Sequence, residues 1–211
     1  MIPSEKEWTD AWIARHGAAL HERFSSSAAA VCGLGGLGSN IAVALARAGI
    51  GKLLLIDFDR VDITNLHRQQ YRANQIGLYK TDALAEILSE IAPYTEIRTV
   101  TAKITEENLA VLLKDADVIC EAFDNAESKA MLVNGVLEQL PDCYLVAASG
   151  MAGMDTPNTI RTRRIMKRFY LCGDGVSDAA DTIGLTAPRV MLCAAHQAHT
   201  VLRILAGEFE V

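Results

Sequence analysis

The 211-residue sequence lacks any pair of cysteines in C-x-x-C spacing. Such pairs are the usual signature of a structural zinc site, so we expect no zinc. Cysteines that stand alone in apolar runs are typical of small buried residues. An odd number of scattered cysteines suits a reducing compartment and predicts a cytoplasmic protein. The five cysteines are Cys32, Cys120, Cys143, Cys172 and Cys193.

The sequence also lacks an excess of basic residues and a long uninterrupted apolar run. A formal net charge of −6 disfavours broad binding to nucleic acids or to membranes, although it leaves room for a small basic pocket that holds phosphate. The longest apolar region, 41–56, is interrupted by Arg47 and Lys52, so we expect no membrane-spanning helix. The acidic N-terminus, 1–12, does not have the pattern of a signal peptide.

What the sequence does contain is a regular alternation of strand-like and helix-like segments. Half of the residues are hydrophobic, which in a chain of this length suffices for a domain with a full core. The alternation predicts an α/β fold with a mostly parallel sheet, and strands that are apolar throughout predict helices on both faces. The expected strands are 28–32, 52–56, 96–101, 116–121 and 143–148, and the expected helices are 36–48, 80–92, 105–114 and 126–139.

The two ends of the chain depart from this alternation. The N-terminal region has helical periodicity with one apolar face, and the pattern weakens after Gly150. No linker or repeat is evident, so we expect a single domain over 1–211 with a short C-terminal extension. The elements expected here are a helix over 4–24, strands of a smaller element at 159–166 and 168–173, a mobile loop over 173–189 and a helix over 190–205.

Four glycines follow the first predicted strand within six residues, in the stretch AAAVCGLGGLGSN (28–40). In the pattern G-x-G-x-x-G, Gly33 turns the chain, Gly35 lets the backbone approach a phosphate, and Gly38 lets the helix pack on the strand. Asp57, at the end of the second strand, is placed to bind a ribose hydroxyl. The pattern predicts a Rossmann-like site that suits NAD, FAD or adenylate about equally; the alternative is a glycine-rich turn without a ligand. The four glycines are Gly33, Gly35, Gly36 and Gly38.

Polar side chains crowd the stretch that follows the second strand, DFDRVDITNLHRQQ (57–70), which a dehydrogenase does not need. Arg68 offers a planar guanidinium that suits phosphate oxygens, and Asn65 is able to hydrogen-bond a terminal phosphate. Lys80 begins the next helix and adds a point charge. Each of these residues alone is ordinarily a solvated surface group, but together they predict a triphosphate site. The predicted nucleotide-binding set is completed by Asp59 and Gln69.

A carboxylate also ends the fourth predicted strand, in CEAFDNAESK (120–129). Ligands of open parallel sheets bind at the carboxyl ends of the strands, so Asp124 is expected to face the same crevice as the glycine turn. A hard carboxylate beside phosphates is where Mg²⁺ binds. The alternative is that Asp124 caps the following helix, and both roles are compatible.

With these motifs together, the sequence resembles the ThiF/MoeB/HesA family, which is related to the ubiquitin-activating enzymes. The resemblance covers about residues 12–207 and rests on GLGGLGS, DFDRVDITNLHRQQ, GLYK and FDN, in the family's order and at similar spacing. It implies an adenylyltransferase that uses ATP and Mg²⁺. The C-terminal glycine of a small ubiquitin-like sulfur carrier ending in Gly-Gly would attack ATP, which releases pyrophosphate and precedes formation of a thiocarboxylate.

The resemblance also implies roles for individual residues and an oligomeric state. It implies a homodimer in which an arginine near the N-terminus of one chain reaches the ATP of the other. Arg15 and Arg23 are the candidates, although neither sits in the family's usual motif. The implied site residues are ribose-binding Asp57, polyphosphate-contacting Asn65, Arg68 and Lys80, and magnesium-associated Asp124, of which Arg68, Lys80 and Asp124 form the expected catalytic set.

The resemblance is strongest to short ThiF-type proteins linked to thiamine biosynthesis, which implies a ThiS-like carrier. Three alternatives stay open. The chain adenylates a MoaD-like carrier of the molybdopterin pathway, it is a non-catalytic nucleotide-binding scaffold, or it is an NAD-dependent oxidoreductase. The last is weakest because it leaves Asn65, Arg68 and Lys80 without a role.

Two further segments carry separate expectations. Some family members use a cysteine for sulfur transfer, and Cys172 stands at the start of the expected loop, where it would be accessible; the alternative is an unreactive cysteine at a strand end. The basic segment RTRRIMKR (161–168) is short in an acidic chain, so we interpret it as a docking strip for an acidic partner rather than for a nucleic acid.

Overall fold

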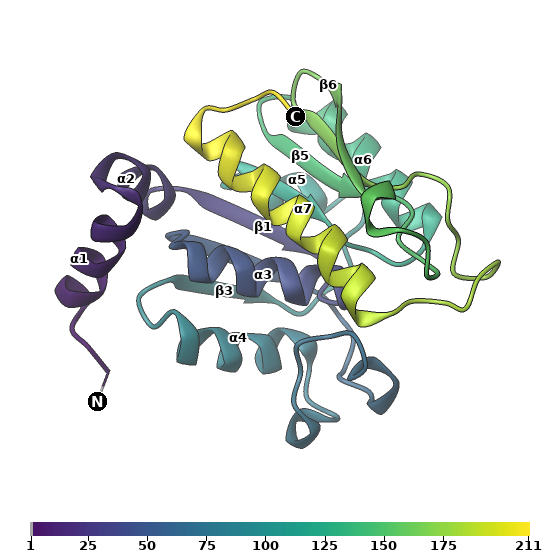
Figure 1. The fold of residues 1–211 in the computed structure, drawn as a ribbon, viewed down its shortest axis with the longest axis horizontal. Coiled ribbons are helices and arrows are strands. Elements are labelled where there is room, and N and C mark those ends of the chain that lie inside the picture. The colour runs from purple at the N-terminus through teal and green to yellow at the C-terminus, as the bar shows by residue number, and fades with distance from the viewer. Residues whose placement is uncertain (1) are drawn as a thin grey trace.

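A single seven-stranded sheet runs through the computed structural model, which describes residues 2–211 (Figure 1). The strand order is β3-β2-β1-β4-β5-β7-β6. Neighbouring strands are parallel except β6, which runs antiparallel to β7. The predicted α/β fold with a mostly parallel sheet is therefore confirmed. The strands are β1 (Ala28–Cys32), β2 (Lys52–Ile56), β3 (Glu96–Val100), β4 (Val118–Glu121), β5 (Tyr144–Ala148), β6 (Arg161–Met166) and β7 (Phe169–Gly173).

Helices cover both faces of the sheet, as the apolar strands predict. Helices α3, α4 and α7 pack on one face and form one layer of the core, while α5 and α6 form a second layer on the other face (Figure 1). Alternate residues of β1 point into the two layers: Val31 joins the first and Cys32 the second. The helices are α1 (Glu5–His16), α2 (Ala18–Ser25), α3 (Gly36–Ala48), α4 (Lys80–Ile91), α5 (Leu109–Leu113), α6 (Ala126–Gln139) and α7 (Ala187–Ala206).

The expected N-terminal helix over 4–24 is wrong in one respect, because it is two helices. Gly17 separates α1 from α2 with a φ of 86°, a conformation that favours glycine and ends the helical path. Helix α1 buries no residue fully. Its tryptophans, Trp8 and Trp12, instead pack edge to face on each other, with ring centroids 5.6 Å apart.

The expected smaller element after Gly150 is also wrong, because β6 and β7 extend the main sheet. Strand β6 forms the sheet edge, and a tight turn at 167–168 leads from it to β7, which pairs with β5 in parallel. The sequence pattern weakens here because β6 is an exposed edge strand, so its residues need not be apolar. The segment between β7 and α7 is irregular, as expected.

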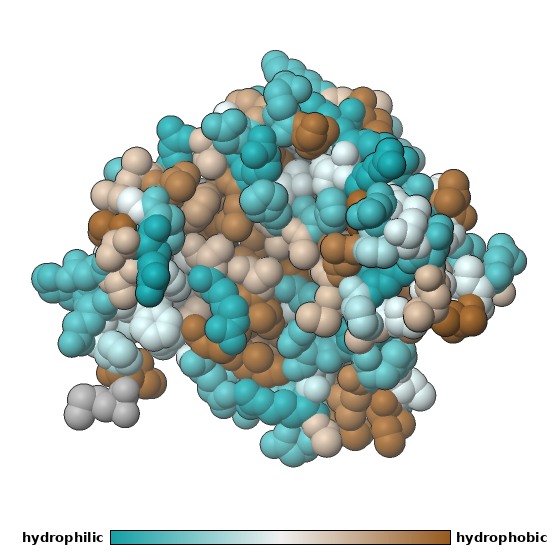
Figure 2. Space-filling view, viewed as in Figure 1, coloured by the Kyte–Doolittle hydropathy of each residue, from teal (hydrophilic) through white to brown (hydrophobic). Residues whose placement is uncertain are grey.

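The connection from β2 to α4 is long and contains two short 3-10 helices, η1 (Ile63–Asn65) and η2 (Ala73–Gln75). It exposes Ile63 and nearby apolar side chains, and a group of hydrophobic residues lies over this connection at the lower right of Figure 2. The connection carries several of the predicted phosphate-binding residues. Within the described residues, no helix is both long and apolar enough to span a membrane.

Candidate functional site

A cleft of about 670 Å³ opens at the carboxyl ends of the strands. Its volume suits a ligand of nucleotide size. The glycine turn after β1, the β2–α4 connection and the start of α6 contribute to its walls. The cleft therefore brings together the motif residues predicted from sequence: Gly33, Gly35, Gly36, Asp57, Asp59, Asn65, Arg68, Gln69, Lys80 and Asp124 all line it.

The glycine turn is shaped by close backbone contacts. Gly33 has a φ of 89°, and a Cβ atom there would lie 2.8 Å from the carbonyl oxygen of Ala122. Gly38, also predicted to contact the nucleotide, does not line the cleft. A Cβ atom there would lie 1.8 Å from the carbonyl oxygen of Gly33, so the turn requires glycine at this position. Gly35 is different, since a Cβ atom there would meet only the Nε2 atom of Gln69, at 3.8 Å. Packing therefore requires the first and last glycines, but not Gly35.

Helix α3 begins at this turn without a side-chain cap. Its N-cap residue is Gly35, and no side chain accepts a hydrogen bond from the first-turn amides. The amides of Gly36 and Leu37 therefore face the cleft with the positive end of the helix dipole. This arrangement suits a phosphate group.

Asp57 holds the end of β2 to the glycine turn. Its buried carboxylate accepts hydrogen bonds from the backbone N–H of Leu34, at 2.6 Å, and of Asp59, at 2.8 Å. The carboxylate still lines the cleft. Its predicted contact with a ribose hydroxyl stays a prediction.

Lys80 lies buried at the start of α4. Its Nζ atom donates a hydrogen bond to Oδ2 of Asp59 at 2.8 Å, and lies 3.9 Å from Oδ2 of Asp57. The ammonium group therefore stands between two carboxylates at the edge of the cleft. The Lys80 ammonium group can be buried this deeply because the carboxylates of Asp57 and Asp59 lie next to it.

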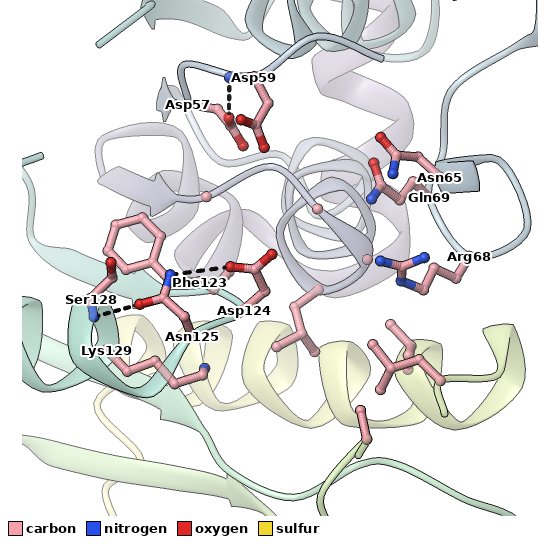
Figure 3. A pocket seen from close by; sticks show the side chains of 18 of the residues that line it. Asp57, Asp59, Asn65, Arg68, Gln69, Phe123, Asp124, Asn125, Ser128 and Lys129 are labelled. Atoms are coloured by element: carbon pink, nitrogen blue, oxygen red, sulfur yellow. Dashed lines mark hydrogen bonds between the residues drawn. The ribbon is translucent and has the colours of Figure 1, made fainter. Parts of the chain in front are cut away.

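Arg68 carries a guanidinium group that has no carboxylate partner among the described residues (2–211). Its NH1 atom contacts the carbonyl oxygen of Thr64 at 3.3 Å and Nε2 of His67 at 3.2 Å. Figure 3 shows Arg68 beside Asn65 and Gln69 on one side of the cleft. This wall therefore offers a positive charge without an acidic partner among residues 2–211.

Asp124 and Asn125 lie on the opposite side of the cleft, at the start of α6 (Figure 3). Asn125 caps the helix, because its Oδ1 atom accepts a hydrogen bond from the backbone N–H of Ser128 at 2.8 Å. The alternative in which Asp124 caps the helix is therefore wrong. The exposed Asp124 carboxylate accepts a 3.3 Å hydrogen bond from Asn125 Nδ2 and remains open to a ligand.

No group of three or more His, Cys, Asp or Glu side chains within residues 2–211 is arranged to hold a metal ion. A divalent cation at Asp124 would therefore need further oxygen ligands from phosphate groups or water. That donor set is the one Mg²⁺ uses when it binds together with a nucleotide.

Sequence reasoning missed an ion pair on this side of the cleft, between a buried acid and a lysine that lines the cleft. Glu121, the last residue of β4, is 1% exposed, and both of its carboxylate oxygens lie 3.0 Å from Nζ of Lys129 on α6. Burial raises the pKa of Glu121, although the adjacent ammonium and backbone amides favour its charged form. The available signal was an acid at the end of an otherwise apolar strand, VICE (118–121).

The expected accessibility of Cys172 is wrong. The residue lies near the end of β7, in agreement with the expected strand and with the alternative of a strand-end cysteine, and is 0% exposed. Its sulfur packs toward Thr162 and Thr200, and burial raises the pKa of the thiol. A protonated and enclosed thiol has neither the charge nor the access that sulfur transfer needs.

The candidate N-terminal arginines lie away from the cleft of their own chain. Helices α1 and α2 precede β1 and lie at the opposite end of the sheet from the glycine turn (Figure 1). Arg23 donates a hydrogen bond to the carbonyl oxygen of Ala206, at the end of α7. Neither Arg15 nor Arg23 lines the cleft, so either could serve a nucleotide only in another copy of the chain.

The basic segment 161–168 forms the edge strand β6 and its turn. Two of its arginines have acidic partners in the chain, since Arg164 pairs with Glu210 and Arg168 with Asp142. Its expected role as a docking strip stays a prediction.

Comparisons with known proteins identify the family of the chain. The model of the ThiF family matches residues 10–211. The chain is 32% identical over 154 residues to the molybdopterin-synthase adenylyltransferase of Haemophilus influenzae, an alignment that covers 70% of this chain and 63% of the relative. It is 40% identical over 103 residues to the adenylyltransferase and sulfurtransferase MOCS3 of Anopheles gambiae, covering 48% of this chain and 23% of the relative. The chain thus spans less than two thirds of the length of these relatives.

A solved structure supports the fold. The ATP complex of the Escherichia coli tRNA N6-threonylcarbamoyladenosine dehydratase TcdA superposes with a TM-score of 0.86, covering 99% of this chain and 98% of that one. The two sequences are 21% identical, so this likeness concerns the fold alone.

Proposed function

The chain belongs to the ThiF family, and from this premise we propose that it is an ATP-dependent adenylyltransferase. Its substrate is the C-terminal glycine carboxylate of a small ubiquitin-like sulfur carrier, and its products are the carrier acyl-adenylate and pyrophosphate. One observation carries the proposal. A single cleft places an uncapped helix N-terminus between an unneutralised guanidinium, on Arg68, and an exposed carboxylate, on Asp124.

The residues of the cleft fit ATP and Mg²⁺. The free amides at the start of α3 and the guanidinium of Arg68 would hold the phosphates, and Asp57 would accept a ribose hydroxyl. Asp124 would hold Mg²⁺ together with phosphate oxygens. When bound, Mg²⁺ offsets the negative charge of the triphosphate.

The proposed reaction brings a carboxylate against a triphosphate, so two anions must approach each other. The nucleophile is already ionised, and no side chain has to remove a proton. Arg68 and Lys80 would instead offset the repulsion and stabilise the charge that moves onto pyrophosphate. Lys80 would exchange part of its contact with Asp59 for a phosphate oxygen. Catalysis by these residues is then positioning and electrostatic stabilisation.

The carrier is the finer part of the proposal. The motifs of the sequence favour a ThiS-like carrier of thiamine biosynthesis, whereas the names of the relatives equally support a MoaD-like carrier of the molybdopterin pathway. We propose the ThiS-like carrier and keep the MoaD-like carrier as the alternative. We also propose a homodimer, in which Arg15 or Arg23 of one chain approaches the nucleotide of the other.

An exchange assay tests the proposal. Each carrier type, ending in Gly-Gly, is incubated with the protein, Mg·ATP and labelled pyrophosphate. Incorporation of label into ATP that depends on the carrier supports adenylation, and its dependence on one carrier type identifies the pathway. A carrier truncated by its last glycine is the matched control. Binding of ATP without exchange indicates a scaffold, and stabilisation by NAD but not by ATP indicates an oxidoreductase.

A further inference from the structure

The ion pair of buried Glu121 and partly exposed Lys129 lies at the edge of the cleft that carries Asp124, and Lys129 itself lines the cleft. Glu121 ends β4, and Lys129 lies in the first part of α6, on the far side of the loop that contains Asp124. Figure 3 shows Lys129 reaching from α6 beneath Asn125 and Asp124. The pair therefore bridges the two ends of this loop, with 3.0 Å between Nζ and each carboxylate oxygen.

The same two side chains hold the backbone around the loop. The Oε1 atom of Glu121 accepts a 2.7 Å hydrogen bond from the backbone N–H of Phe123, the residue immediately before Asp124. Lys129 donates a third bond, of 3.1 Å, to the carbonyl oxygen of Ala148, the last residue of β5. One ion pair therefore ties the end of β4, the end of β5 and the start of α6 to each other.

Stability alone does not explain a charged pair at this position. Removing two charges from water costs free energy that their attraction offsets only in part, and apolar replacements of such pairs are often neutral or stabilising. The strand leading to Glu121 is buried throughout, so an apolar residue would suit its packing. The three directed bonds of Lys129 and the bond to Phe123 instead fix the direction in which the loop leaves the sheet.

We propose that Glu121 and Lys129 are positioning residues that hold Asp124 in the orientation needed to bind a divalent cation together with the triphosphate. The inference rests on the proposed role of Asp124 in Mg·ATP binding. Lys129 lines the cleft, but its Nζ atom donates to both carboxylate oxygens of Glu121 and to the carbonyl oxygen of Ala148, so we assign it to holding the loop rather than to binding phosphate. Groups that orient a metal ligand commonly change metal affinity by about 10- to 100-fold when they are removed.

Calorimetry of ATP binding, with Mg²⁺ and with EDTA, tests this inference. For the wild-type protein we expect Mg²⁺ to tighten ATP binding. In Glu121→Gln and in Lys129→Met, this tightening should fall by about 10-fold or more, while the affinity for metal-free ATP stays within about twofold of wild type. Glu90→Gln is the control and should change neither affinity, because Glu90 on α4 forms an exposed pair with Arg72 and neither residue lines the cleft.

A double-mutant cycle separates positioning from a general structural effect. If Glu121 and Lys129 act through Asp124, the Asp124→Asn variant should already have lost the Mg²⁺-dependent tightening of ATP binding. Adding Glu121→Gln to it should then lower this tightening little further. The double variant Glu121→Gln/Lys129→Met leaves no unpaired charge and guards against misfolding of the single variants. Thermal unfolding of each variant confirms that the protein tested is folded.

Two results would overturn the inference. One is an effect of Glu121→Gln on Mg²⁺-dependent tightening that adds fully to the effect of Asp124→Asn. The other is an equal loss of affinity for metal-free ATP and for Mg·ATP in Glu121→Gln and Lys129→Met. Failure of the proposed function gives a different pattern. Wild-type protein would then bind Mg·ATP, the variants would lose the metal-dependent tightening, and no carrier would support exchange of pyrophosphate.

Discussion

Lys80 and Asp59 form a 2.8 Å hydrogen bond at the edge of the cleft, between a buried ammonium group and a half-exposed carboxylate. The bond orients the Lys80 side chain, which is almost fully shielded from solvent. A triphosphate would compete with Asp59 for the same ammonium group. By contrast, Arg68 has no acidic partner among the described residues, so it would bind phosphate without breaking an ion pair. Before a nucleotide binds, Lys80 is therefore held in an ion pair, whereas Arg68 is available to bind phosphate.

Arg68→Ala should lower carrier-dependent exchange of pyrophosphate by about 10²- to 10³-fold, because it removes a charge that stabilises the departing phosphates. The melting temperature should change little, since within residues 2–211 the guanidinium forms hydrogen bonds only with Thr64 and His67. Arg98→Ala, on the exposed edge strand β3, is the matched loss of an arginine outside the cleft and should retain full exchange. Full activity of the purified Arg68→Ala protein would contradict the assignment.

Gly38→Ala and Gly35→Ala should separate folding from binding. The added Cβ atom at Gly38 would overlap the carbonyl oxygen of Gly33, so we expect a loss of about 2 kcal/mol or more in the free energy of unfolding. The Cβ atom at Gly35 has space in the protein and should leave stability nearly unchanged while it weakens ATP binding. Denaturant unfolding and calorimetry measure the two effects. Normal ATP affinity in Gly35→Ala would show that no phosphate approaches this backbone.

Asp174 should contribute to stability against acid. Burial opposes its ionisation, but hydrogen bonds from Ser177, Val176 and the guanidinium of Arg189 prevail and lower its pKa to about 2. A carboxyl whose pKa falls on folding stabilises the protein fully above its ordinary value of 3.8. That contribution, about 2 kcal/mol, is lost as the pH falls toward 2.

Asp174→Asn checks this expectation. The variant should unfold at lower denaturant concentration at pH 7, and its stability should depend less on pH between 4 and about 2 than that of the wild type. An unchanged acid profile would mean that another carboxyl dominates this range.

Cys172 should be inert in the native protein. Its thiol is fully buried, and burial raises its pKa, so a water-soluble disulfide reagent should not label it without unfolding. Among the five cysteines only Cys143 is partly exposed and available for labelling. Cys172→Ser should keep carrier-dependent exchange at the wild-type level. Rapid labelling of Cys172, followed by mass spectrometry, would contradict the buried position.

The order of motifs along the chain was sufficient to predict the cleft. Strand, glycine turn, helix and acid occur in sequence, and parallel strands bring their carboxyl ends to one edge, so Asp57 and Asp124 had to meet there. The local pattern could not decide which residue caps α6. Asp124 and Asn125 both suit an N-cap, and only the backbone path selects Asn125.

Other features depend on contacts that a single sequence does not display. The pairing of Glu121 with Lys129 joins residues on a strand and a helix, and neither belongs to a recognised motif. The hairpin of β6 and β7 looked like a separate element because an edge strand does not need an apolar pattern. The accessibility of Cys172 was overestimated because the sequence does not show that β7 lies inside the sheet, between β5 and β6.

A crystal structure of the protein with Mg²⁺ and a non-hydrolysable ATP analogue tests the central claim most directly. We predict that phosphate oxygens contact the amides of Gly36 and Leu37 and the side chains of Arg68 and Lys80, with the cation on the Asp124 side. A nucleotide bound elsewhere, with Arg68 and Lys80 unchanged and remote from its phosphates, would contradict the account.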